Sequence, residues 1–103
     1  MGPLFFDPRG ADFTVWINHF TNEVYRNWIT PQPALMGVGG RVDVEFTVER
    51  DGRLSAVRLL TSSGNNMLDK AGMDSLSESR FLPLSSDYRP PNVTMRAAFF
   101  YNR

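Results

Sequence analysis

A strictly alternating stretch near the middle of the chain constrains the fold more than any other feature. Between residues 41 and 49 every second side chain is apolar, and the others are charged or polar. The apolar set is Val42, Val44, Phe46 and Val48, and the polar set is Arg41, Asp43, Glu45, Thr47 and Glu49. Because successive side chains of a β-strand point to opposite faces, the pattern predicts a strand with one buried face. Asp51-Gly52 follows, a dipeptide that suits a type I′ turn and predicts a hairpin.

Two more strands are predicted from the remaining alternation. Residues 53–61 return after the turn, but their apolar positions switch from even to odd numbers at Val57. A bulge near Ser55-Ala56, or partial cover on both faces, accounts for this switch. The third strand closes the chain over residues 92–101 and alternates again. Its apolar set is Val93, Met95, Ala97, Phe99 and Tyr101.

Two amphipathic helices are predicted to cover the sheet. The first spans residues 12–29, with Asp12 as its N-cap. Its apolar side chains recur at steps of three and four residues: Phe13, Trp16, Ile17, Phe20, Val24 and Trp28. The second helix, residues 66–79, has a narrower apolar face. Two prolines follow the first helix, and residues 34–40 are interpreted as a turn leading into the first strand. Their glycines do not have the spacing of a phosphate-binding loop.

These segments predict a two-layer α+β domain in the order α-β-β-α-β. A three-stranded antiparallel sheet carries both helices on one face, and the last strand pairs with residues 41–50. Residues 53–61 and 92–101 are then the two edge strands. With 103 residues, the chain is expected to hold one domain, residues 12–103. Residues 1–11 are an irregular lead-in, with Phe5 or Phe6 docked on the body.

Composition excludes several classes of function. Eleven basic and eleven acidic residues give a net charge of zero, so the chain lacks the basic excess that nucleic-acid binding needs. There is no Cys and only one His, so thiolate chemistry and two-histidine metal sites are excluded, and no cofactor or metal is expected. Asp43, Glu45 and Glu49 lie on the polar face of a strand, where contact with solvent accounts for three carboxylates. They are therefore not interpreted as a pair for acid–base catalysis.

No motif predicts an enzyme. The Ser62-Ser63-Gly64 sequence lacks the glycine pattern of a nucleophile elbow, and His19 lies within the first helix. The alternative of a small enzyme or ligand-binding domain remains, with a pocket under the aromatic helix near His19 and Ser63. Chemical shifts in a fragment screen would discriminate it.

Surface recognition is the better-supported class. If the last strand lies at a sheet edge, we expect it to have no neighbour on its outer side, so that its unpaired N–H and C=O groups can pair with an extended peptide. The predicted partner-binding residues are those of the whole strand: Asn92, Val93, Thr94, Met95, Arg96, Ala97, Ala98, Phe99, Phe100 and Tyr101. Phe100 lies on the face opposite the core, so either a loop or terminal segment covers it or it is a contact surface. The same edge could instead form a strand-exchanged homodimer.

The order of elements and several motifs resemble the C-terminal domain of the TonB family of energy transducers. The glycine, strand and Asp-Gly turn of residues 40–54 are similar to the family signature, and so is the second strand ending in Ser-Ser-Gly at residues 57–64. Leu68-Asp69-Lys70-Ala71 resembles the start of the family's second helix, and Phe81-Leu82-Pro83-Leu84 its exit. The resemblance covers residues 29–102. The long first helix is also similar to the third domain of TolA, which shares the fold.

The resemblance implies a non-catalytic periplasmic domain, tethered in the full protein by an N-terminal inner-membrane helix. It implies coupling through that helix to a proton-driven complex like ExbB–ExbD. The domain itself would bind a peptide segment of an outer-membrane transporter, which joins the sheet beside residues 92–101. The alternative within the same fold is a TolA-like adaptor for cell-envelope integrity.

Overall fold

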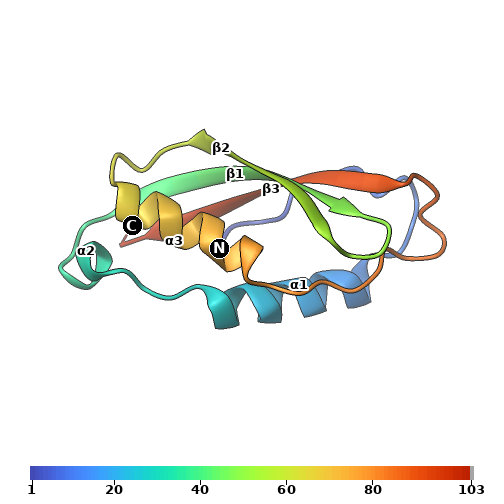
Figure 1. Ribbon diagram of the computed structural model, residues 1–103, viewed down its shortest axis with the longest axis horizontal. Coiled ribbons are helices and arrows are strands. Elements are labelled where there is room, and N and C mark those ends of the chain that lie inside the picture. Colours follow the sequence, from blue (N-terminus) through green and yellow to red (C-terminus); the bar gives the residue numbers. More distant parts are fainter. Residues whose placement is uncertain (103) are drawn as a thin grey trace.

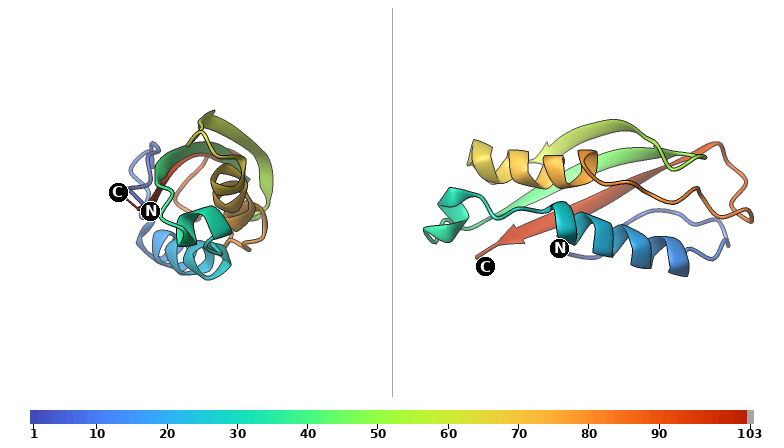
Figure 2. Two further views of the ribbon diagram at one scale, coloured as in Figure 1. Left: turned by 90° about the vertical axis from the view of Figure 1, so that its left-hand side faces the viewer. Right: turned by 60° about the horizontal axis from the view of Figure 1, so that its bottom comes forward.

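Three antiparallel strands and two long helices form two layers (Figure 1). The computed structural model describes residues 1–102. Its elements are α1 (Thr14–Asn27), α2 (Gln32–Leu35), β1 (Gly40–Glu49), β2 (Leu54–Thr61), α3 (Asn66–Ser77) and β3 (Asn92–Tyr101). The sheet curls over both helices when it is viewed end-on (Figure 2). The predicted α+β class and order are confirmed, with one additional short helix.

β1 is the central strand, because the sheet order is β2-β1-β3. Ten consecutive residue pairs join β1 to β3, from Gly40 opposite Tyr101 to Glu49 opposite Asn92. The apolar side chains of β1 are at most 1% exposed, whereas the side chains between them are not buried. The predicted alternation, and the predicted pairing of the last strand, are confirmed.

β2 departs from regular pairing at two places. Thr47 faces Ala56 and Val48 faces Leu54, so Ser55 is an extra residue on this strand. This is the bulge predicted near Ser55-Ala56. A second shift makes Leu60 an extra residue, and its side chain is exposed. Because bulges twist an edge strand and disrupt its ladder, they make β2 a poor template for a further strand.

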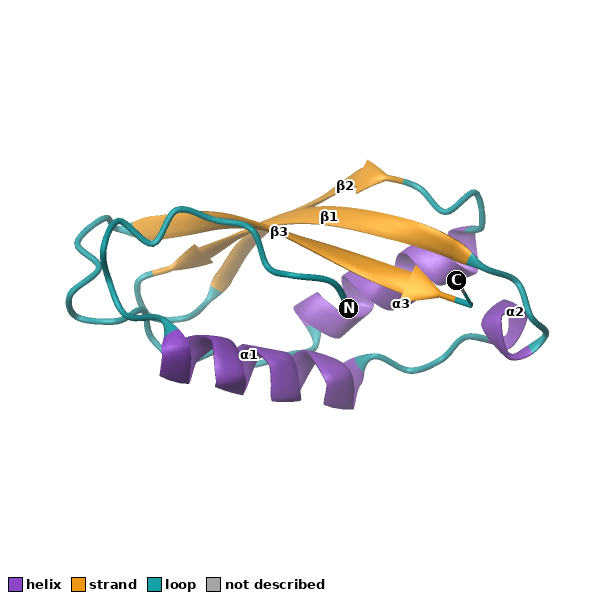
Figure 3. Cartoon of the chain, turned by 180° about the vertical axis from the view of Figure 1, so that it is seen from behind, coloured by secondary structure: helices purple, strands orange, loops and turns teal. Residues whose placement is uncertain are grey.

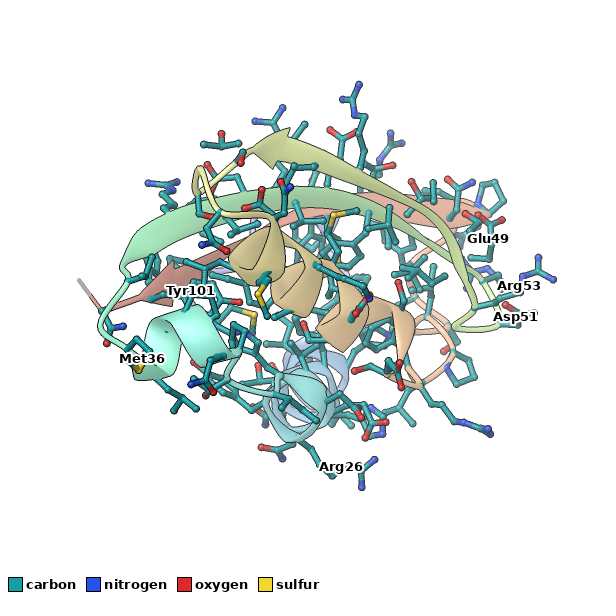
Figure 4. All side chains as sticks on the ribbon, turned by 60° about the vertical axis from the view of Figure 1, so that its left-hand side comes forward. Arg26, Met36, Glu49, Asp51, Arg53 and Tyr101 are labelled. Carbon is teal, nitrogen blue, oxygen red and sulfur yellow. The ribbon has the colours of Figure 1, made fainter. Side chains whose placement is uncertain are left out.

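The predicted type I′ turn between β1 and β2 is wrong. A type I′ turn needs positive φ at both central residues, but only Gly52 has it, with φ +90°. Gly52 N–H donates to Glu49 O at 2.9 Å, and Glu49 N–H donates to Arg53 O at 2.8 Å. This arrangement is a three-residue loop that ends on a left-handed glycine. Glu49, Asp51 and Arg53 mark this end of the molecule in Figure 4.

α1 is shorter than the predicted residues 12–29. Its N-cap position is Phe13, but the Asp12 carboxylate accepts a hydrogen bond from Thr14 N–H at 2.9 Å, so Asp12 still satisfies one free donor. The buried face of α1 is Trp16, Phe20 and Val24. The ring of Phe20 stacks on that of Phe46 with 5.6 Å between centroids, which confirms that the aromatic stripe covers β1.

The chain between α1 and β1 differs from prediction. Trp28 lies beyond the end of α1 and is only partly buried; its indole N–H donates to the Tyr101 hydroxyl at 2.7 Å. The predicted turn over residues 34–40 begins instead inside the short helix α2. Pro31, in extended conformation, precedes α2, and Pro33 occupies its first turn, where a missing N–H costs nothing.

α3 fills the space between β1, β2 and α1. Its first turn is capped by Asn65, whose side-chain oxygen accepts from Met67 N–H and Leu68 N–H. Gly72 lies within the helix because the ring of Phe99 approaches closely: a Cβ at this position would lie 3.2 Å from that ring. α3 ends at Ser77, two residues before the predicted end.

Candidate functional site: the outer edge of the last strand

β3 is an edge strand, and its register with β1 determines which of its backbone groups face outward. Arg96 faces Glu45 on β1 but exchanges both of its hydrogen bonds with a residue on the other side. In an antiparallel ladder the bonding direction alternates at every residue. The even-numbered residues of β3 therefore present N–H and C=O to the outer edge, and the odd-numbered residues bond to β1.

The residue on the other side is Phe5, from the leading segment that precedes α1. Phe5 N–H donates to Arg96 O at 3.0 Å, and Arg96 N–H donates to Phe5 O at 2.9 Å. Gly2 N–H donates to Ala98 O at 2.9 Å. Figure 3 shows this segment running back beside β3 before α1 begins. The expectation that the outer side of β3 has no neighbour is therefore wrong at Arg96 and Ala98.

Side chains of the leading segment alternate like those of a strand. Leu4 and Phe6 are partly buried against the core, whereas Phe5 is 59% exposed on the opposite face. The ring of Phe6 packs edge-on against Phe13, with centroids 4.8 Å apart. Of the two residues expected to dock on the body, Phe6 packs on the core and Phe5 contributes its backbone.

The pairing covers only the middle of the edge. A regular ladder would place Pro3 opposite Ala98, but proline has no N–H, and the bond to Ala98 comes from Gly2 instead. Within residues 1–102 the leading segment makes no backbone hydrogen bond to Thr94 or Asn92. A shallow cavity of about 290 Å³ opens beside these two residues, between the loop before α1 and the loop before β3. This part of the edge is therefore accessible to another chain.

Phe100 lies on the face away from the core, as expected. A Cβ added to Gly2 would lie 2.9 Å from the Phe100 ring, so the terminal segment covers part of that ring, and Phe100 is 37% exposed. The Arg41 guanidinium lies 5.4 Å from the ring centroid, within the range of a cation–π contact. Ala98, beside it, is 5% exposed.

The predicted site residues therefore divide into two sets. Val93, Met95, Ala97, Phe99 and Tyr101 are buried in the core and support the strand from behind. Asn92, Thr94, Arg96, Ala98 and Phe100 carry the outward backbone groups. Sequence reasoning did not assign Gly2 or Phe5 to this site. The apolar trio Leu4, Phe5 and Phe6 was the available signal, but three consecutive apolar residues do not alternate and are too few to predict a strand.

An open groove of about 730 Å³ lies over the outer face of the sheet, bordered by Phe5 and Arg96. Its charged side chains pair with one another. Arg41 Nε lies 2.8 Å from Asp43 Oδ1, and Glu45 is flanked by Arg58 at 3.0 Å and Arg96 at 3.9 Å. Because these exposed pairs largely neutralise each other, the groove offers no strong field of one sign.

The Ser-Ser-Gly loop between β2 and α3 is held by a buried carboxylate. Asp69 accepts from the Ser62 hydroxyl, from Ser63 N–H at 2.8 Å and from the Ser63 hydroxyl at 2.7 Å. Burial alone would raise the pKa of Asp69, but these hydrogen bonds outweigh it and lower the pKa. Both serine hydroxyls are thus committed to fixing the loop.

Within residues 1–102, no helix combines the length and the apolar character needed to span a bilayer.

Comparison with known proteins identifies a family. Residues 31–102 match the family described as Gram-negative bacterial TonB protein C-terminal. The chain is also similar to protein TonB of Haemophilus influenzae, with 34% identity over 65 residues. That match covers 63% of this chain and 24% of the relative, so the chain corresponds to about a quarter of that protein.

Solved structures agree. A TonB C-terminal domain of Helicobacter pylori superposes with a TM-score of 0.69 at 16% identity, covering 91% of this chain and 86% of its own. The TonB C-terminal domain of Pseudomonas aeruginosa gives a TM-score of 0.56 at 27% identity, with coverages of 72% and 79%. At 16% identity the first likeness shows the fold alone.

Proposed function

Since this chain belongs to the family of Gram-negative bacterial TonB protein C-terminal domains, we propose that it is a periplasmic adaptor for an outer-membrane transporter. It binds an extended segment of the transporter, which adds as a strand to the outer edge of β3. The domain performs no catalysis. It transmits force through the added strand.

One observation carries this proposal: the outer edge of β3 already pairs with an extended segment. Phe5 and Arg96 exchange two backbone hydrogen bonds in antiparallel geometry. An edge that accepts one strand can accept another of similar form, because the bonds involve only main-chain groups. The other edge is less suitable, since β2 carries two bulges.

The geometry suits a mechanical link. β3 pairs with the central strand over ten residues, and its odd-numbered side chains lie in the core. A peptide bonded along β3 would therefore be attached to a strand that is anchored both in the core and to the central strand. A pull parallel to the strands loads several hydrogen bonds together.

The rest of the energy-coupling machinery is part of the proposal. In the full protein, an N-terminal helix would anchor the domain in the inner membrane. That helix would couple it to a proton-driven complex like ExbB–ExbD. The match to a quarter of a longer TonB protein is consistent with this arrangement.

The test is a proline substitution that removes a backbone donor from the outer edge and none from the ladder to β1. Thr94 N–H faces outward, so Thr94→Pro removes one donor from the edge and leaves the ladder to β1 intact. Proline at the inward-facing Met95 or Ala97 would instead break that ladder. Thr94→Ala is the matched control, because it loses the 3.0 Å contact with the Thr47 hydroxyl but keeps the N–H.

We expect synthetic peptides from the N-terminal periplasmic segments of transporters to bind the parent domain and the Thr94→Ala variant similarly. Binding to Thr94→Pro should be weaker by about tenfold, because one hydrogen bond of about 1 kcal/mol is lost and the ring blocks close approach. Thermal unfolding and titration calorimetry are measured on the same samples. Equal affinity in a folded proline variant would contradict strand addition. Capture of Tol–Pal components in place of transporter peptides would favour the TolA-like alternative.

A further inference from the structure

The leading segment occupies the same backbone groups that an incoming peptide needs. Among the outward-facing residues of β3, Arg96 and Ala98 lie at the middle of the edge. Both are hydrogen-bonded to the leading segment. A peptide that pairs along the whole strand therefore cannot bind while Gly2 and Phe5 remain in place. The two segments exclude each other.

The leading segment pairs with β3 over only part of its length. It makes three backbone hydrogen bonds to β3, and Pro3 interrupts the ladder between them. Phe6 is only partly buried where it packs against Phe13. A peptide without a proline at the place of Pro3 could form additional bonds and extend to Thr94. Such a peptide has more main-chain bonds available than the segment it displaces.

A tight turn lies between the leading segment and α1. Arg9 and Gly10 both have positive φ, at 49° and 78°, and Ala11 N–H donates to Pro8 O at 2.9 Å. This tight turn folds the chain back so that residues 2–6 reach β3. Because the segment is tethered there, its effective concentration at the edge is high, on the order of millimolar for short linkers.

We infer that residues 2–6 are a built-in competitor for the outer edge of β3, which an incoming extended peptide must displace. The displacing peptide has apolar side chains at two alternate positions, in the places of Leu4 and Phe6, and an outward side chain between them. The identity of the peptide as a transporter segment rests on the proposed function, but the competition does not. Residues 2–6 occupy the edge in part of the molecules, and only the remaining fraction can bind the peptide. The measured association constant of the peptide is therefore the intrinsic constant multiplied by that remaining fraction.

The test uses the full chain and a probe taken from it. Phe5→Pro deletes the N–H that donates to Arg96 O, and Phe5→Ala is the matched control, because it keeps that N–H while removing the same exposed ring. The probe is a synthetic capped peptide, Gly-Pro-Leu-Phe-Phe-Asp, which corresponds to residues 2–7. Binding is followed by the amide chemical shifts of β3.

We expect the probe to bind Phe5→Pro at least fivefold more tightly than it binds the parent or Phe5→Ala, with shifts along β3. The amide of Arg96 should also exchange with solvent at least tenfold faster in Phe5→Pro, while the inward amides of Met95 and Ala97 keep their rates. An unchanged Arg96 rate, or equal probe affinity in all three proteins, would overturn the inference. Shifts confined to β2 would overturn it as well.

A second peptide separates this inference from the proposed function. If transporter peptides bind neither form while the probe binds Phe5→Pro, the competition stands and the proposed function fails. If transporter peptides bind the parent and Phe5→Pro equally well, with shifts along β3, the proposed function stands and the competition is refuted.

Discussion

Replacing Gly52 with alanine should destabilise the domain more than the same change at Gly64. Gly52 ends the β1–β2 turn with φ +90°, and an added Cβ would lie 2.5 Å from Phe81 O and 2.7 Å from Leu82 O. Gly64 has nearly the same backbone conformation, φ +88°, but a Cβ there would meet nothing within 4 Å. The pair separates the cost of a left-handed alanine from the cost of the clash.

The expected magnitudes follow from these contacts. A non-glycine residue in the left-handed region costs about 1–2 kcal/mol, and this is the whole effect expected at Gly64. At Gly52 the segment at residues 81–82 must also move. The atoms that the new Cβ would meet belong to the backbone, so they cannot be displaced by rotating a side chain. That movement endangers the 2.8 Å hydrogen bond from the Trp16 indole to Leu82 O, which is worth about 1 kcal/mol. With the residual strain, the total for Gly52→Ala is about 3–4 kcal/mol.

Urea and thermal denaturation measure both variants against the parent domain. For a chain of this size, a loss of about 3 kcal/mol lowers the melting temperature by roughly 15 °C. Gly64→Ala, which should cost about 1–2 kcal/mol, should lower it by roughly 5–10 °C. Equal losses at the two positions would refute the reasoning, because they would mean that the packing of residues 81–82 on the turn contributes nothing.

Two further changes test the core and the serine loop. Phe46→Ala should lower the free energy of unfolding by about 3–5 kcal/mol, because Phe46 is 1% exposed and stacks on Phe20. Trp28→Ala should lower it by less, since Trp28 is only partly buried. Chemical denaturation of both variants compares the two losses. Because hydrogen bonds hold the pKa of Asp69 below its unfolded value near 3.9, its contribution to stability is fully present above about pH 4 and is lost as the pH falls through the lower folded value. Asp69→Asn should therefore be less stable than the parent at pH 7 and lose less stability on acidification, as stability curves between pH 7 and pH 2 would show. A parent and variant with parallel pH curves would contradict this role of Asp69.

The parts of the fold that follow from local pattern were predictable. The alternation around Phe46 determines both faces of β1, and the change of parity at Val57 reveals the bulge at Ser55. These signals are strong because a residue on the wrong face of a sheet would bury charge or expose apolar surface.

Features that depend on tertiary contacts were not predictable. The turn type is a separate case, because a glycine with positive φ suits both a type I′ turn and the three-residue loop found here, so Asp51-Gly52 alone does not decide between them. Trp28 was assigned to α1 by its spacing, but its indole N–H bonds to Tyr101 on β3 instead.

The same limit applies to the candidate site. The edge position of β3 could be predicted from the order of the strands. Its partial occupation could not, because the three backbone bonds between β3 and residues Gly2 and Phe5 depend on a turn at Arg9 and Gly10 that brings together residues more than ninety positions apart. A short segment containing a proline gives no strand signal of its own.

Residue-specific amide exchange with a bound transporter peptide tests strand addition most directly. The account predicts slower exchange at the outward-facing amide of Thr94, with no change at the inward-facing amide of Met95, which is already bonded to β1. Slower exchange on β2 alone, or no change at Thr94 under saturating peptide, would contradict it.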